Sequence, residues 1–161
     1  MRLAVCPGSF DPVTLGHVDI IQRASRLFDK VIVLVSVNAL KKPSFTVDER
    51  IEMIRSVTVG LENIEIDSSD GLLADYIREK GAVAIVKGLR AVSDFEYEFQ
   101  MALANKKLYS EAETIFLTTA SENMYLSSSV VKQIASFGGD ISHFVPPSVL
   151  PLIKKRLVKG E

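Results

Sequence analysis

Several features of secreted, membrane and nucleic-acid-binding proteins are missing from this 161-residue sequence. It contains no tryptophan, and its single cysteine, Cys6, excludes an internal disulfide and favours a reducing, cytoplasmic setting. No apolar run is long enough to span a bilayer, and the N-terminus lacks the pattern of a signal peptide. Nineteen basic residues nearly balance twenty acidic ones, so no charge excess favours binding to nucleic acid or to a membrane.

The composition that remains is typical of one globular domain. Apolar residues make up 47% of the chain and charged residues 24%. The length is near the common domain size, and no repeat, low-complexity tract or linker divides the chain, so we expect a single domain over residues 1–161. Cys6 lies within an apolar run, which favours a small buried side chain over a nucleophile.

Short apolar segments alternate with segments of helical periodicity along the chain. The clearest strand is the β-branched run KVIVLVSV at residues 30–37. Thr46 followed by Glu49 predicts a capping box at the start of a helix that continues to Val57. The other expected strands are residues 2–6, 64–66, 82–86 and 114–117, and the other expected helices are about 17–28, 72–80, 94–108, a segment after 127, and 148–158.

This alternation predicts an α/β fold. Strands separated by helices imply right-handed crossovers, and therefore a parallel sheet with helices on both faces. We expect a Rossmann-like, doubly wound parallel sheet of five strands. Ligands of such sheets bind at the carboxyl ends of the strands, near the point where the strand order reverses. The residues that follow each strand are therefore the first candidates for a site.

The loop after the first strand combines small and polar residues. Pro7-Gly8 is predicted to break that strand, and Ser9 places a hydroxyl in the same turn. Gly16-His17 then opens a helix, whose free amide groups and dipole favour an anion. An imidazole at that place can donate a hydrogen bond to a phosphate oxygen.

Basic residues and hydroxyls follow other strands as well. Lys41 and Lys42 come after the second strand, residues 87–90 (KGLR) after the fourth, and serines 127–129 after the last. Lysines after strands are usually solvated, and we expect this for Lys42. The serines could simply cap a helix, which is compatible with an anion site because both use the same amides. Together the clusters predict a polyphosphate site at one end of the sheet.

The motifs themselves resemble a known family. Thr14-x-Gly16-His17 is similar to the T/HxGH signature of the nucleotidylyltransferase superfamily. The longer string PGSFDPVTLGH at residues 7–17, followed by KKPSF, KGLRAVSDFEYE and SSSVVK in that order, resembles bacterial phosphopantetheine adenylyltransferases. These motifs extend from residue 7 to residue 132 and so cover most of the chain.

The resemblance implies a reaction and its partners. The expected activity is transfer of the adenylyl group of ATP to 4′-phosphopantetheine, which gives dephospho-CoA and pyrophosphate in coenzyme A synthesis. It also implies a homohexamer and makes coenzyme A a candidate feedback inhibitor. Mg²⁺ is expected as the counter-ion of the triphosphate, without a separate structural metal site.

The resemblance further implies roles for individual residues. Catalysis is expected to involve Ser9, His17, Lys41 and Arg90, with His17 stabilising the transition state. The residues expected to hold ATP are Ser9, Phe10, His17, Gly88, Leu89, Arg90, Glu98, Asn123, Met124, Tyr125, Leu126, Ser127, Ser128 and Ser129. Those expected to hold phosphopantetheine are Ser9, Lys41, Leu73 and Lys87.

The chemistry of adenylyl transfer suits these residue types. An acceptor phosphate is already ionised at neutral pH, so its attack on the α-phosphorus needs no protein base. It needs positioning and stabilisation of charge on the equatorial and leaving oxygens. Lysine, arginine, histidine and hydroxyl groups supply both.

Three other functions share some of these features. The acceptor could be a mononucleotide, as in NAD synthesis. A nucleotide-binding regulator without catalysis is disfavoured because both His17 and Lys41 are present. A dehydrogenase is disfavoured because no GxGxxG follows the first strand.

Overall fold

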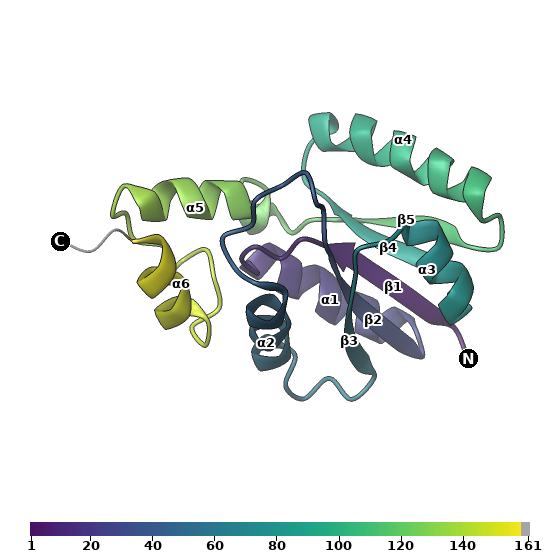
Figure 1. The fold of residues 1–161 in the computed structure, drawn as a ribbon, viewed down its shortest axis with the longest axis horizontal. Coiled ribbons are helices and arrows are strands. Elements are labelled where there is room, and N and C mark those ends of the chain that lie inside the picture. Colours follow the sequence, from purple (N-terminus) through teal and green to yellow (C-terminus); the bar gives the residue numbers. More distant parts are fainter. Residues whose placement is uncertain (159–161) are drawn as a thin grey trace.

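The computed structural model describes residues 1–158, apart from the side chains of residues 92 and 93; residues 159–161 of the expected domain lie outside the described residues. Five strands form one parallel sheet in the order β3-β2-β1-β4-β5 (Figure 1). They are β1 (Leu3–Gly8), β2 (Lys30–Ser36), β3 (Ile64–Ser69), β4 (Ala84–Leu89) and β5 (Glu113–Thr118). The predicted α/β fold is confirmed.

Helices cover both faces of this sheet. On one face lie α1 (Leu15–Leu27) and α2 (Val47–Val57), and on the other lie α3 (Leu73–Lys80) and α4 (Val92–Leu108) (Figure 1). A short 3-10 helix, η1 (Ser121–Asn123), leads from β5 to α5 (Ser128–Ser136) and α6 (Leu150–Leu157) beyond the carboxyl ends of the strands. Within residues 1–158, no helix combines the length and the apolar character needed to cross a membrane.

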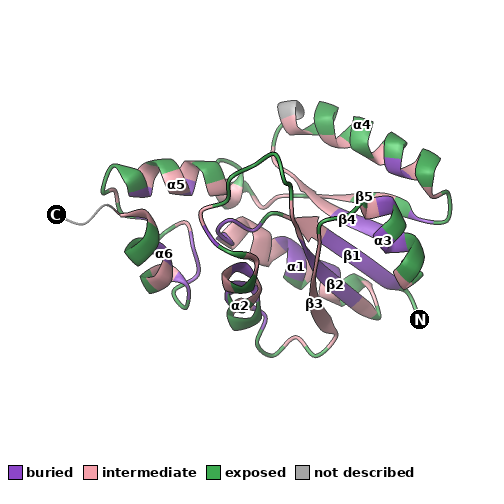
Figure 2. Ribbon diagram, in the orientation of Figure 1, coloured by how far each residue is buried: buried purple, intermediate pink, exposed green. Residues whose placement is uncertain are grey.

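The alternation of side chains along β2 explains why this strand is apolar throughout. Ile32 and Leu34 belong to a buried cluster with Ile77 of α3, whereas Val31 and Val33 belong to clusters on the face of α1 and α2. Both faces of a central strand are therefore core, and its surface is buried along most of its length (Figure 2).

The strand order reverses between β1 and β4. β1 pairs with β2 over all six residues of Leu3–Gly8, but with β4 only at Ala4 and Val5. Beyond Val5 the pairing of β1 with β4 stops, and Pro7 has no amide hydrogen with which to extend it. Strands that part at their carboxyl ends mark the place where doubly wound folds bind ligands.

Strand ends are the part of the sequence prediction that the structure corrects. Residues 87–89 were expected to follow the fourth strand, but they are its last residues and pair with residues 116–118 of β5. Pro7-Gly8 was expected to break the first strand, yet both residues pair with β2. Pairing with a neighbouring strand, rather than local composition, sets these ends.

Candidate active site

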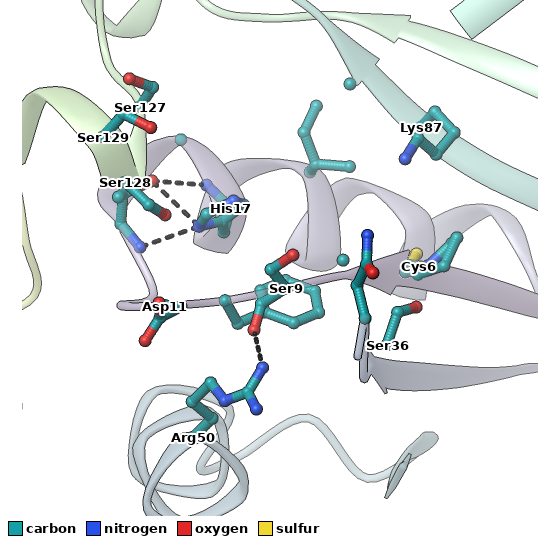
Figure 3. Close-up of a pocket in the computed structure, with 18 of the residues that line it drawn as sticks. Cys6, Ser9, Asp11, His17, Ser36, Arg50, Lys87, Ser127, Ser128 and Ser129 are labelled. Atoms are coloured by element: carbon teal, nitrogen blue, oxygen red, sulfur yellow. Dashed lines mark hydrogen bonds between the residues drawn. The ribbon is translucent and has the colours of Figure 1, made fainter. Parts of the chain in front are cut away.

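A pocket of about 620 Å³ lies where β1 and β4 part (Figure 3). Its volume is that of a small-molecule site. Its wall carries six cationic side chains and two carboxylates, although the whole chain has a formal charge of −1. These charged groups are Lys41, Lys42, Arg50, Lys87, Arg90 and Lys132, with Asp11 and Glu98. Such a local excess of positive charge favours a phosphorylated ligand.

Most of the predicted site residues meet at this pocket. Those that line it are Ser9, Phe10, His17, Lys41, Lys87, Gly88, Arg90, Glu98, Leu126, Ser127, Ser128 and Ser129. Those outside its lining are Leu73, Leu89, Asn123, Met124 and Tyr125. Leu73 packs against the core cluster under α3, and the Tyr125 ring packs edge-on against Phe144. Lys42, expected to be solvated, is exposed at the pocket wall.

The chain turns sharply after β1, at Phe10, whose φ of 48° lies in the left-handed region. The Phe10 side chain is only 4% exposed, and its ring meets the His17 ring edge-on with 5.0 Å between centroids. Gly8 makes room for it, because a Cβ there would lie 3.0 Å from the Phe10 ring. The Phe10 ring therefore packs against His17 and forms part of the pocket lining.

His17 closes a capping box at the start of α1. The Thr14 hydroxyl accepts a hydrogen bond from the His17 backbone N–H at 3.4 Å, and His17 Nδ1 accepts one from the Thr14 backbone N–H at 3.0 Å. A backbone amide can only donate, so Nδ1 carries no hydrogen and the ring proton resides on Nε2. Since Nε2 has no partner among the described residues, it is the donor left for a ligand.

The surroundings of His17 keep its ring neutral. Burial, and after it the positive charges of Arg90 and Lys87, lower the pKa of His17 from 6.5 to about 4. At neutral pH the ring is therefore a fixed hydrogen-bond donor without a charge. Such a group can stabilise negative charge on an oxygen without itself taking up a proton.

Two carboxylates one turn apart on α4 hold the cations at the end of β4. The Arg90 guanidinium donates to both oxygens of Asp94, at 3.0 and 3.2 Å, and to the Leu126 carbonyl at 2.7 Å. Lys87 Nζ lies 3.3 Å from Glu98 Oε1. Glu98, a predicted ATP contact, thus pairs with a predicted acceptor contact. The bidentate pairing with Asp94 fixes the orientation of the Arg90 guanidinium.

The serine cluster forms the start of α5 at the pocket wall. The Ser127 side chain caps the helix by accepting a hydrogen bond from the Val130 N–H at 3.1 Å. The Ser128 hydroxyl donates to the Pro12 carbonyl at 2.7 Å, which ties α5 to the loop after β1. Ser129 is exposed. The free amides of the first turn remain available for an anion.

Besides Lys42, three charged residues of the wall were not among the predicted site residues. Arg50, 3% exposed, donates to the Ser9 carbonyl at 3.0 Å (Figure 3). Asp11, 5% exposed, forms an ion pair with Lys132 of α5. Asp11 and Lys132 both lie within the motifs that carry the family resemblance, but they are 121 residues apart. No spacing in the sequence indicates that they meet.

Comparison with known proteins places the chain among nucleotidyltransferases. Residues 5–134 match the model of the cytidylyltransferase-like family. A phosphopantetheine adenylyltransferase of Heliobacterium modesticaldum is 58% identical over 93% of this chain and 89% of its own length. One from Caldanaerobacter subterraneus subsp. tengcongensis is 56% identical over 99% of this chain and its whole length. A nicotinic acid mononucleotide adenylyltransferase of Plasmodium falciparum, complexed with NaAD, has a TM-score of 0.69, with 16% identity over 96% of this chain and 95% of that one, which shows a shared fold.

The fold, the cationic pocket and the family match together define a nucleotidyltransferase of the cytidylyltransferase-like class. Within that class, the chain belongs to the phosphopantetheine adenylyltransferase family. The resemblance predicted from the motifs is confirmed. Membership in a family of transferases also counts against a dehydrogenase or a regulator without catalysis.

Proposed function

We propose that this chain catalyses the reversible transfer of the adenylyl group of ATP to 4′-phosphopantetheine in coenzyme A biosynthesis. An oxygen of the acceptor phosphate attacks the α-phosphorus, and the bond from that phosphorus to the oxygen bridging the β-phosphate breaks. The products are dephospho-CoA and pyrophosphate. The observation that carries the proposal is the neutral His17, whose Nε2–H has no partner within the part of the chain that the structure describes and which lies beside a strongly cationic wall.

In this mechanism His17 donates its Nε2–H to an oxygen of the α-phosphate as charge builds on it. Because the Thr14 amide already holds Nδ1, the ring need not reorient during the reaction. A preorganised donor of this kind lowers a barrier by about 2.7–4 kcal/mol. No protein base is needed, since the acceptor is ionised at neutral pH.

The remaining residues divide between the two substrates. We assign Arg90 and the first turn of α5, with Ser128 and Ser129, to the outer phosphates of ATP. The rest of the nucleotide is assigned to Phe10, Gly88, Leu89, Glu98 and residues 123–127. Phosphopantetheine is assigned to Lys41 and Lys87, with Leu73 on the pantetheine side and Ser9 between the two substrates. Lys41 is exposed on the segment after β2 and lines the pocket, which supports its proposed role of bringing the acceptor phosphate to the reacting centre.

Mg²⁺ would enter with ATP as the counter-ion of the triphosphate. Among the residues that the structure describes, no group of three or more histidine, cysteine or carboxylate side chains is placed to hold a metal ion. Phosphate oxygens and water would supply most of its ligands, as is usual for Mg²⁺ bound with nucleotides. The protein's part is to hold the phosphates.

The acceptor is tested by incubating the chain with ATP, Mg²⁺ and either 4′-phosphopantetheine or nicotinate mononucleotide, while pyrophosphate release is measured. We expect turnover with phosphopantetheine, and Lys41→Ala should raise its KM and lower the rate. Lys107→Ala, which changes an exposed lysine of α4 outside the pocket, is the matched control. Turnover with the mononucleotide alone would show that the proposed acceptor is wrong.

We also propose that the chain assembles as a homohexamer. Helix α4 has large apolar side chains exposed on more than one side, and Figure 2 shows the helix largely exposed. They are Phe95, Tyr97, Phe99, Met101 and Leu103, each 40–64% exposed. An apolar surface of this kind is typical of subunit contacts. Light scattering after gel filtration should give six times the mass of one chain, and the mass of a monomer would contradict the proposal.

Coenzyme A contains the groups of the product dephospho-CoA, so we expect it to occupy the same pocket and act as a feedback inhibitor. Inhibition should be competitive with at least one substrate. A cytoplasmic location, where both substrates and the reduced Cys6 thiol would be present, completes the proposal.

A further inference from the structure

Asp11 stands at the wall of the pocket, but its carboxylate is turned toward the protein. The two oxygens accept hydrogen bonds from the Ser44 N–H, at 3.1 and 3.0 Å, and Oδ1 accepts one from the Phe45 N–H at 2.9 Å. Lys132 completes the set as an ion pair from α5. One buried carboxylate thus joins three segments that are far apart in the sequence.

The segment that Asp11 holds is the one that carries Lys41. Residues 38–43 are all exposed, and the hydrogen bonds of Leu40 and Lys41 reach no further than Asn38. The first anchored point after them is Ser44-Phe45, three residues beyond Lys41, where Phe45 is 1% exposed. On its outer side, Arg156 of α6 donates to the Ser44 carbonyl at 2.8 Å and lies over the Phe45 ring.

Asp11 also belongs to the loop that carries the other reacting groups. It follows Ser9 by two residues and precedes the capping box of His17 by three. Its hydrogen bonds therefore fix the distance between that loop and the base of the Lys41 segment. Charge-assisted bonds to backbone amides are strong and directional, which suits them to this task.

We propose that Asp11 is a positioning residue that sets where Lys41 stands relative to His17, with Lys132 as its counter-charge. This inference rests on the proposed role of Lys41 in binding the acceptor. Lys132 has a second effect, because it neutralises a carboxylate that would otherwise repel phosphates at the wall. Neither residue needs to touch a substrate.

A double-mutant cycle tests the coupling of Asp11 to Lys41. Asp11→Asn keeps the shape but aims an NH₂ group at one of the donors. It should lower kcat/KM for phosphopantetheine by about tenfold to a hundredfold, the loss typical of a misplaced group. In the Lys41→Ala background the same change should cost less than about threefold, so that the losses at the two sites are clearly non-additive. Equal losses in both backgrounds would overturn the proposal.

Hydrogen exchange gives a readout that does not depend on activity. Asp11→Asn should speed exchange of the amides of residues 40–46 while leaving those of β1 and β2 unchanged. Lys132→Met keeps the hydrogen bonds from the Ser44 and Phe45 amides to Asp11. We therefore expect exchange to speed up at the same residues, but by a smaller factor. Asp140→Asn is the matched control, because Asp140 is an exposed carboxylate that also accepts a backbone hydrogen bond, from Ser142 at 2.9 Å.

These experiments distinguish a wrong proposed function from a wrong inference about Asp11. If the unaltered chain makes no dephospho-CoA, the proposed function is wrong, and exchange still tests whether Asp11 holds the segment. If Asp11→Asn does not fold, the cycle with Lys132→Met and Lys41→Ala takes its place, and additive losses there overturn the inference. Unchanged exchange at residues 40–46 in a folded Asp11→Asn variant would overturn it as well.

Discussion

The Nδ1 atom of His17 lies 3.0 Å from the backbone nitrogen of Thr14 and accepts its hydrogen. The same contact that caps helix α1 therefore decides which ring nitrogen carries the proton. It leaves Nε2–H as a donor of fixed direction, beside Arg90 and Lys87, whose charges disfavour a protonated ring. Structural capping and the proposed chemistry are performed by one side chain.

Removal of the His17 ring should affect turnover far more than nucleotide binding. We expect His17→Ala to lower kcat by about 10²–10³-fold, because its hydrogen bond strengthens in the transition state. The KM for ATP should change little by comparison. Steady-state kinetics measures both, and His143→Ala, at the other and exposed histidine, is the control. A normal kcat in His17→Ala would rule out the role.

The ionisation of His17 gives a prediction about pH. With its pKa lowered from 6.5 to about 4, the ring should stay neutral and protonated at Nε2 between pH 8 and 5. Between pH 6.5 and 4 the unfolded chain binds a proton that the folded chain does not, so the contribution of His17 to stability falls as the pH drops through this window. Nitrogen NMR on the His143→Ala variant, which leaves a single histidine, reads the tautomer and the titration directly. A hydrogen on Nδ1 at pH 7 would contradict the assignment.

Replacement of Arg90 by lysine should weaken ATP binding although the charge is kept. Lysine cannot reproduce the fork that spans Asp94 and the Leu126 carbonyl, so the cation would lose its fixed orientation. We expect the KM for ATP to rise about tenfold, which corresponds to roughly 1.4 kcal/mol. Arg78→Lys is the control, because Arg78 also bridges a carboxylate and a carbonyl, those of Asp75 and Leu108, outside the pocket. An unchanged KM would show that the fork is not used.

Gly88 should be intolerant of any side chain, for a reason of packing. A Cβ at this position would lie 2.9 Å from Cγ1 of Ile20, where α1 crosses β4. We expect Gly88→Ala to destabilise the fold by about 1–3 kcal/mol in urea unfolding. The cost should shrink in an Ile20→Ala background, which removes the obstructing atom. Gly71→Ala, whose Cβ would meet only Ser69 Oγ at 3.6 Å, should be nearly neutral, and equal costs at both glycines would refute this explanation.

The strands and helices could be predicted because the spacing of apolar residues along the chain indicates each of them. The run at 30–37 is apolar throughout, and the capping box of Thr46 and Glu49 is present as expected. Strand ends were less predictable, since residues 87–89 continue β4 only because β5 lies beside them. The hydrogen bonds of residues 87–89 are made with β5, which is distant in the sequence. No pattern of residues near position 87 could therefore predict where β4 ends.

For the site, the order of residues along the chain was enough to show which residue types lie near the ends of the strands, and its motifs identified the family that the comparisons confirm. The tertiary structure sets which of these side chains meet. It paired Lys87 with Glu98, turned Phe10 into the core, and joined Asp11 to Lys132 across 121 residues. The physical reason is that hydrogen bonds and ion pairs depend on distances of a few ångströms in space, whereas periodicity and spacing report only on neighbours along the chain.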